Sequence, residues 1–212
     1  MKKILAVVLL VVVSLALLSC KKNVTGPSTA NYTIVFRQGV SPTTGFLDET
    51  DAFLYDYNAT SNYGFDPYGN VGYEAGFEHM ALQFFIDGYL PAKAVVTSVY
   101  LTMHCSHVYT SGNVIAYSLD QRLHESTDTW NDITDISGPV SDAVYVSAVS
   151  YYDFKLDNGM VQDWIDNLGS SFGVVLRSQV ESGTQPNVVF DSNDNTNPLY
   201  RPMLTVYYSV TK

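Results

Sequence analysis

Basic side chains are scarce in this chain of 212 residues, which carries 11 Lys and Arg against 21 Asp and Glu, for a net charge of −10. Between residues 23 and 211 the basic side chains are scattered along the sequence: Arg37, Lys93, Arg122, Lys155, Arg177 and Arg201. Binding to nucleic acid requires basic side chains gathered on one surface, where they neutralise phosphates. The sequence therefore predicts no nucleic-acid partner.

Cysteine is also scarce, with only Cys20 and Cys105. A small fold held together by several disulfides is excluded by this count. Because Cys20 has another expected role, given below, Cys105 has no intrachain partner. The stability of the fold must come from burial of apolar side chains, with a bound metal as the one further source.

Sequence motifs for catalysis are missing as well, since no HExxH, GxSxG, Walker or GxGxxG pattern occurs. On a regular strand, His104 and His107 point to opposite faces, so zinc bound by both is not expected. The many carboxylates can form the pairs that glycosidases use, which leaves a polysaccharide lyase or hydrolase as a less favoured alternative. We expect a protein that is not an enzyme.

A single long apolar run, Ile4–Leu18, follows Lys2 and Lys3 and is too short for the ~20 residues that span a bilayer. The sequence Leu17-Leu18-Ser19-Cys20 resembles a bacterial lipobox, in which the cysteine thiol receives a diacylglyceryl group before cleavage. We therefore expect a signal peptide at residues 1–19, lipidated Cys20 with a flexible linker at residues 20–30, and one domain at residues 31–212. The mature chain has 212 − 19 = 193 residues and, without Lys2 and Lys3, a net charge of −12. Two or more acyl chains anchor a protein stably, which predicts attachment to a membrane of the bacterial cell envelope, at the outer membrane or cell surface.

From Tyr32 onward the apolar pattern has mostly a period of two residues, which is typical of strands with one buried face. The clearest case is 95–106, where Val99, Leu101, Met103 and Cys105 are expected to point inward. Gly, Asn, Asp, Ser and Pro separate the other predicted strands. These are 32–37, 52–57, 81–86, 114–119, 152–156, 173–177, 188–191 and 203–210.

One helix is predicted, because Met160, Val161, Trp164, Ile165 and Leu168 recur at helical spacing. Asp157 or Asn158 can cap its start and Gly169 can end it. Trp164 lies in the middle of the apolar stripe and is expected in the core. The sequence thus predicts an all-β fold, a jelly-roll β-sandwich with one short helix.

Short motifs along the chain resemble those of the DNRLRE domain, named for the disaggregatase-related repeat and classed among carbohydrate-binding modules. They occur in the family's order over nearly the whole expected mature domain. They are 35–39 (VFRQG), 51–54 (DAFL), 62–64 (NYG), 71–72 (VG), 91–101 (PAKAVVTSVYL), 129–131 (TWN), 161–164 (VQDW), 172–178 (FGVVLRS), 189–192 (VFDS) and 201–208 (RPMLTVYY).

This resemblance implies a jelly-roll sandwich, association with polysaccharide and a structural calcium ion, and it implies no catalytic residues. The chain departs from the family pattern at 82–87 (LQFFID), where the family usually has an Arg. Any role of that Arg is therefore in doubt for this chain.

Calcium ligands have two sets of candidates. Asp191, Asn193 and Asn195 alternate like the first ligands of an EF-hand, but Thr196 and Pro202 replace its Gly and Glu, so the loop is not an EF-hand. Asp191 and Asn193 remain candidate ligands in a sandwich loop, with a solvated turn as the ordinary alternative. Asp51 and Asn62, beside the opening motifs of the resembled family, are the second set.

Tyrosine is abundant, with 16 copies, and its flat face and polar tip suit both sugar-binding surfaces and ordinary sandwich cores. The preferred ligand-binding region is an aromatic stretch interspersed with Asn and Gly, together with one tryptophan: Tyr55, Tyr57, Tyr63, Tyr68, Tyr73 and Trp130. Plain packing is the alternative for each of them. We expect a surface-tethered polysaccharide-binding lipoprotein, and its negative charge favours neutral glycans over uronates. The alternative is a structural or adhesive envelope protein that binds protein or matrix.

Overall fold

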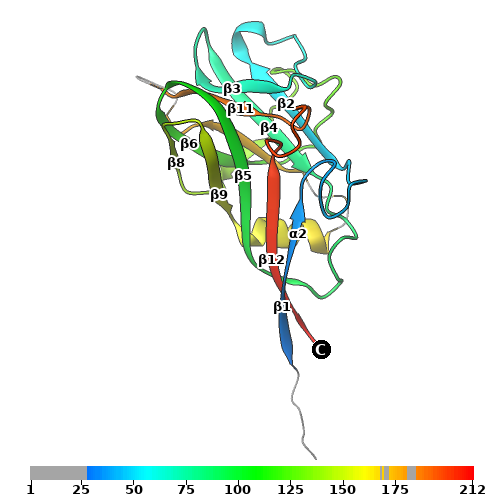
Figure 1. Cartoon of the computed structure of the whole chain (residues 1–212). Coiled ribbons are helices and arrows are strands. Elements are labelled where there is room, and N and C mark those ends of the chain that lie inside the picture. The colour runs from blue at the N-terminus through cyan, green and yellow to red at the C-terminus, as the bar shows by residue number, and fades with distance from the viewer. Residues whose placement is uncertain (1–27, 168, 170–171, 181–184) are drawn as a thin grey trace, which may run out of the picture. The chain divides into compact units, whose positions relative to one another are not determined.

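The computed structural model describes residues 28–167, 169, 172–180 and 185–212, and Ala30–Val210 forms one compact unit. The described residues contain twelve strands, one 3₁₀ turn and one α-helix (Figure 1). Their bounds are β1 (Thr29–Phe36), β2 (Glu49–Tyr55), η1 (Asp56–Asn58), β3 (Tyr68–Tyr73), β4 (Phe77–Phe84), β5 (Val95–Thr110), β6 (Gly112–Leu119), β7 (Ile136–Pro139), β8 (Val144–Val146), β9 (Ser150–Leu156), α2 (Asn158–Asp166), β10 (Val174–Ser178), β11 (Asn187–Asp191) and β12 (Met203–Thr211).

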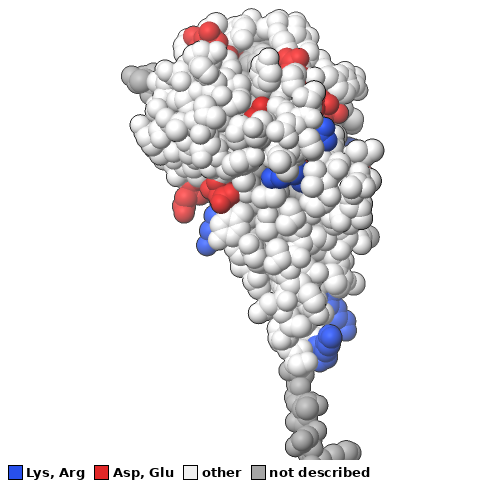
Figure 2. All heavy atoms as spheres, in the orientation of Figure 1, with Lys and Arg blue, Asp and Glu red and all other residues white. Residues whose placement is uncertain are grey.

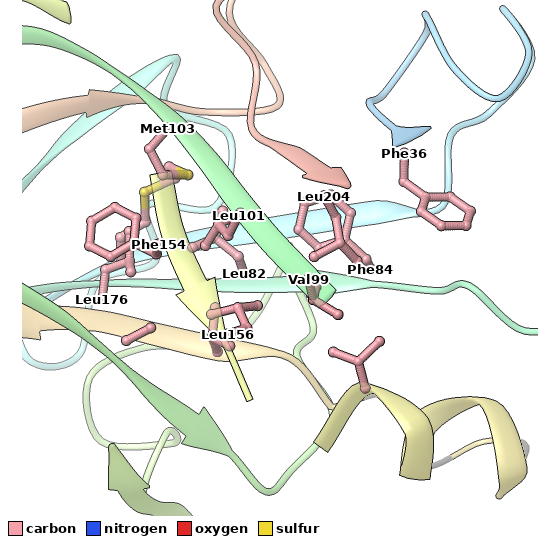
Figure 3. Packing of buried hydrophobic residues seen from close by; sticks show 14 of the residues in the cluster. Phe36, Leu82, Phe84, Val99, Leu101, Met103, Phe154, Leu156, Leu176 and Leu204 are labelled. Atoms are coloured by element: carbon pink, nitrogen blue, oxygen red, sulfur yellow. The ribbon is translucent and has the colours of Figure 1, made fainter. Parts of the chain in front are cut away.

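The strands form one curled antiparallel sheet with the order β1-β12-β5-β11-β3-β4-β10-β6-β7. Three further strands pair beside this path, β2 with β4, β8 with β6 and β9 with β5. The sheet folds over itself, so that side chains of β5 and β9 meet those of β4 and β10 in one core (Figure 3). The predicted all-β, sandwich-like fold with one short helix is confirmed.

Strand β5 is the longest and organises the sheet around it (Figure 1). One edge pairs with β9, while the other pairs first with β12, up to Thr102, and then with β11, from Cys105. The chain that connects β11 to β12, residues 192–202, therefore lies where the second edge of β5 changes partner. This arrangement brings that connection next to His104.

The residues of β5 that were predicted to point inward form part of the core: Val99, Leu101, Met103 and Cys105 are all fully buried. Phe154 of β9 packs edge-on against Phe190 of β11, with 6.3 Å between the ring centroids. Cys105 is a free thiol, as expected. Burial of large apolar side chains is worth about 1.5–3 kcal/mol each, which makes this continuous core the main source of stability.

Helix α2 begins where the sequence predicts, with Asp157 as its N-cap: the Met160 amide donates to Asp157 Oδ1 at 2.8 Å. Val161 and Trp164 are buried on its inner side, which confirms the predicted core position of Trp164. Leu168, the last residue of the predicted stripe, lies outside the described residues.

Three strands were not predicted from the sequence. β3 has the sequence YGNVGY, whose two glycines weaken the strand signal, and β7 (ISGP) and β8 (VYV) are very short. The expected signal peptide, Cys20 and most of the linker lie outside the described residues. Within the part of the chain that is described, no helix is both long enough and apolar enough to cross a membrane.

Candidate functional site

A groove of about 510 Å³ lies over β3, β11 and the second half of β5, beside the 192–202 connection. Its walls are aromatic rings, imidazoles, amides and hydroxyls, a mixture that suits a ligand with apolar faces and many hydroxyl groups. We call it the groove; its lining residues are Tyr68, Asn70, His104, Ser106, His107, Tyr109, Val189, Asp191, Asn195, Thr196, Asn197 and Tyr200.

An irregularity in β5 places two histidines in the groove. Phe190 pairs with Cys105, but Val189 pairs with His107, so Ser106 is an extra residue on the β5 side of the ladder. This bulge shifts the side-chain phase by one residue. The expectation that His104 and His107 point to opposite faces is therefore wrong, because that expectation assumed a regular strand.

The floor of the groove is a buried pair of His104 and Asp191. His104 Nδ1 hydrogen-bonds Asp191 Oδ2, and Asn195 Nδ2 donates to the other carboxylate oxygen at 2.6 Å. Tyr200 stacks on the imidazole, with 4.1 Å between the ring centroids and 9° between the planes. Asp191, a predicted calcium ligand, is thus engaged through both oxygens in fixing His104 and the loop that carries Tyr200.

Three tyrosines give the groove its exposed aromatic surface: Tyr68, Tyr109 and Tyr200 are 58%, 65% and 37% exposed. Tyr109 also contacts the His107 ring, with 4.2 Å between the centroids. Rings that remain this exposed in the folded protein are available to stack on a ligand. Tyr68 was among the predicted ligand-binding residues, whereas Tyr109 and Tyr200 were not.

The other predicted aromatic residues lie apart from the lining of the groove. Tyr55 contacts both Tyr63, at 4.7 Å and edge-on, and Tyr57, at 5.6 Å and stacked. Tyr73 packs edge-on against Phe77 at 5.5 Å. These tyrosines form local clusters around β2 and β3, and Tyr57 and Tyr73 remain about half exposed.

Trp130 is half-buried and packs against a second, smaller core cluster that includes Leu54 and Ile133. Its ring lies 4.7 Å from that of His79. This position corresponds to the packing alternative that the sequence left open for Trp130.

Four acidic side chains from distant parts of the chain converge in a second site, which we call the acid cluster. Glu49 and Asp51 come from the start of β2, Glu125 from the connection between β6 and β7, and Asp194 from the connection after β11. Asn193 joins them: its backbone amide donates to Asp51 Oδ2 at 2.6 Å, and its Nδ2 donates to Glu125 Oε1 at 3.0 Å and to the Glu49 carbonyl at 3.1 Å.

Burial and mutual repulsion disfavour the charged forms of these acids. Burial is the main cause that raises the pKa of Asp51 well above its usual range, and the charges of Glu125 and Asp194 raise it further. The pKa of Glu49 is also raised well above normal, first by burial and then by Asp51. The pKa values of Glu125 and Asp194 are raised, again mainly by burial.

Several oxygens of the acid cluster are buried without a hydrogen-bond partner: Glu49 Oε1, Asp51 Oδ1, Asn193 Oδ1 and Asp194 Oδ2. A buried oxygen without a partner is costly, and either a proton or a cation relieves that cost. All these atoms are hard oxygen donors of the kind that Ca²⁺ prefers. In the described part of the chain, however, no three His, Cys, Asp or Glu side chains are gathered in a metal-binding arrangement.

Asn62, the fourth predicted calcium ligand, holds the connection that carries Glu125. Its Nδ2 donates to the carbonyls of Glu125 at 2.9 Å and Asp128 at 2.7 Å, and its Oδ1 accepts from the Gly64 amide at 3.3 Å. Of the four predicted ligands, the structure therefore brings Asp51 and Asn193 together, while Asn62 supports their neighbour and Asp191 belongs to the groove.

Arg201 holds the connection that both sites share. It donates through Nε to the Asn195 carbonyl at 2.9 Å and through Nη1 to the Gln38 carbonyl at 3.1 Å. The guanidinium thus fixes the connection between β11 and β12, from which the groove takes Tyr200 and the acid cluster takes Asn193.

No protein-family model matches this chain, and no curated protein matches it. The chemistry of the groove and the acid cluster therefore carries the functional proposal.

Proposed function

We propose that this protein is a non-catalytic polysaccharide-binding lipoprotein of the bacterial cell envelope. The observation that carries the proposal is the groove, where exposed tyrosines stand beside amide and hydroxyl groups. Aromatic faces stack on the C–H faces of sugar rings, while amides and hydroxyls hydrogen-bond sugar hydroxyls. The resemblance to DNRLRE domains and the lipobox-like sequence at Cys20 support the same function.

The ligand is proposed to be uncharged. None of the described residues that line the groove is a Lys or Arg, and its one carboxylate, on Asp191, is already hydrogen-bonded by His104 and Asn195. A polyanion would meet no positive partner there, and the net charge of the whole chain, −10, would repel it.

A glycan array with the purified full-length protein tests this function, run beside screens for polysaccharide lyase and hydrolase activity. The expected result is binding of at least one neutral polysaccharide without turnover. Tyr109→Ala should weaken that binding about tenfold, because it removes one exposed stacking surface. Turnover of a polysaccharide would overturn the non-catalytic proposal, and capture of a protein or matrix partner without any glycan would favour the adhesive alternative.

The lipid anchor has its own test. Cys20→Ala is expected to leave the precursor uncleaved and unlabelled by radioactive palmitate, because the thiol is the acceptor of the lipid. Normal maturation of the variant would show that the lipobox interpretation is wrong.

We further propose that the acid cluster binds Ca²⁺ and has a structural role. Asp51, Glu49 and Asp194 supply carboxylate oxygens and Asn193 an amide oxygen, and each has one buried oxygen without a partner. The bound ion would neutralise the repulsion that raises the pKa values of these acids. The ion would link β2 to the 192–202 connection, and this link would stabilise the groove that the same connection lines.

A further inference from the structure

A second depression, of about 640 Å³, lies on the outer face of β5, β9 and β12. Its lining is again tyrosine and hydroxyl groups: Ser98, Tyr100, Thr102, Tyr151, Thr205 and Tyr207 are among its residues. We call it the strand face. Figure 2 shows that most of the surface in this orientation, in which Figure 1 has β5, β9 and β12 toward the viewer, carries no acidic or basic side chain.

The strand face continues into the groove along one side of β5. Side chains two residues apart lie on the same face of a strand, so Thr102 of the strand face is followed directly by His104 of the groove. The distance from Ser98 to Ser106 along this face is about 27 Å at roughly 3.4 Å per residue. The two depressions are therefore consecutive parts of one elongated surface.

Two exposed tyrosines lie at the junction. Tyr151 belongs to the strand face and Tyr200 to the groove, and their ring centroids are 6.5 Å apart. Both contact the His104 ring between them, Tyr151 at 4.8 Å and Tyr200 at 4.1 Å. The Tyr151 hydroxyl donates to the Leu199 carbonyl at 3.1 Å, which ties β9 to the connection that carries Tyr200. The junction is thus a fixed aromatic surface and not a polar barrier.

The strand face also continues at its other end. Tyr207 lines both the strand face and a third depression of about 380 Å³, which includes Tyr32 and Thr33. Tyr207 contacts Tyr100 edge-on, with 6.1 Å between the centroids. The aromatic surface therefore extends past the strand face and does not end in a wall that would accept only a chain terminus.

The charge of the strand face matches that of the groove. Among its described lining residues there is no Lys or Arg, and its single carboxylate, on Asp153, accepts a hydrogen bond from Thr102 Oγ1 at 2.5 Å. What remains for a ligand on the strand face is ring faces, hydroxyls and the Met203 side chain. An uncharged, hydroxyl-rich chain is the ligand class that fits this surface along its whole length.

We infer that the groove and the strand face are successive subsites for one extended, uncharged polysaccharide chain. This inference rests on the proposed glycan-binding function and adds to it a ligand class: the interior of a long neutral chain, in contact with several consecutive sugar units. A single sugar or a short chain end would occupy only the groove.

The test is a calorimetric titration of the full-length protein with neutral oligosaccharides of increasing length, from disaccharide to hexasaccharide. The probes are the cello-, xylo-, manno- and β-1,3-gluco-oligosaccharide series, with alginate oligosaccharides as the charged comparison. In at least one neutral series, the hexasaccharide is expected to bind at least tenfold more tightly than the trisaccharide, because it reaches the strand face.

Three variants separate the subsites. Tyr207→Ala in the strand face should weaken hexasaccharide binding about tenfold and leave trisaccharide binding unchanged. Tyr109→Ala in the groove should weaken both. Tyr145→Ala is the matched control, since Tyr145 is 62% exposed on β8 and lines neither subsite, and it should change neither affinity.

The outcomes distinguish this inference from the proposed function. Equal affinity for trisaccharide and hexasaccharide, with no effect of Tyr207→Ala, would refute the extended surface while glycan binding by the groove stands. Failure of every neutral oligosaccharide and polysaccharide would refute both. Binding of alginate alone would refute the uncharged ligand class.

Discussion

Glu78, on β4, provides a quantitative test of how burial changes the pKa of a carboxyl group and the stability of the fold. Its side chain is completely buried, and Oε1 accepts a weak hydrogen bond from Asn70 Nδ2 at 3.4 Å. Burial is the main cause that raises the pKa of Glu78 from 4.5 to about 7, and the charges of Glu74 and Asp56 add to the rise.

The size of the effect follows from this pKa. At about 1.36 kcal/mol per pH unit, a rise from 4.5 to about 7 corresponds to about 3 kcal/mol. Below pH 4.5, Glu78 is protonated in both folded and unfolded chains and costs no stability. Between pH 4.5 and about 7 the unfolded chain releases the proton and the folded chain keeps it, so the folded state loses stability as the pH rises.

Glu78→Gln keeps the oxygen that accepts from Asn70 and removes the ionisation. The variant is expected to match the native protein below pH 4.5 and to exceed its unfolding free energy by about 2–3 kcal/mol above pH 7, a shift of about 1 M in the urea midpoint. Urea unfolding followed by circular dichroism across this pH range measures the difference.

Glu74→Gln is the matched control for this experiment. Glu74 also accepts a hydrogen bond from Asn70, at 3.3 Å, but its side chain is exposed. Its replacement removes an exposed charge and only a minor cause of the raised pKa of Glu78, while burial, the main cause, remains, so a much smaller effect is expected. A difference between Glu78→Gln and the native protein that stays flat from pH 4.5 to above pH 7 would refute the burial argument.

Other regions of the molecule give three further predictions. Ca²⁺ at a hundredfold excess over Kd should raise the unfolding free energy by about 2.7 kcal/mol and the melting temperature by about 5–10 °C. Asp51→Asn should abolish this effect. An unchanged melting temperature after chelation would rule out structural calcium. Gly69→Ala should destabilise the fold by about 1–3 kcal/mol, because a Cβ there would lie 2.1 Å from Phe53 Cδ1. Gly138→Ala is the control and should be neutral, because a Cβ there would have no atom within 4 Å. Equal urea midpoints for the two variants would contradict the steric argument. Cys105 should react with a thiol reagent only on unfolding, since it is fully buried, and rapid labelling of the native protein would show that the inward phase of β5 is misplaced.

The fold could be predicted from the sequence wherever the spacing of apolar residues determines the local secondary structure. Val99, Leu101 and Met103 alternate with polar residues and are all buried, and the stripe around Trp164 forms the single α-helix of the described residues. β3 escaped prediction because its residues gain their strand conformation from pairing with β11 and not from their own propensity. Such pairing depends on partners more than a hundred residues away.

The site was much less predictable, for the same reason. Asp51 and Asn193 meet although 142 residues separate them, and nothing local indicates that Glu125 joins them. Asp191 was expected beside Asn193 as a ligand, but it hydrogen-bonds His104 in the groove. A sequence shows which side chains can bind an ion or a sugar, while sheet order decides which of them share a site.

Strand β5 has both of its faces occupied, with core residues on one side and the proposed binding surface on the other. A one-residue insertion or deletion between Ser98 and Cys105 would exchange the two faces, and would remove the core and the ligand surface in a single step. Substitutions on the outer face carry no such penalty, because they leave the inner face unchanged. Across related sequences, this segment should therefore hardly vary in length, even where its outer residues differ. The bulge at Ser106 lies after the fully buried run that ends at Cys105, and a second irregularity lies before Ser98, so length variation should be confined to the ends of the strand.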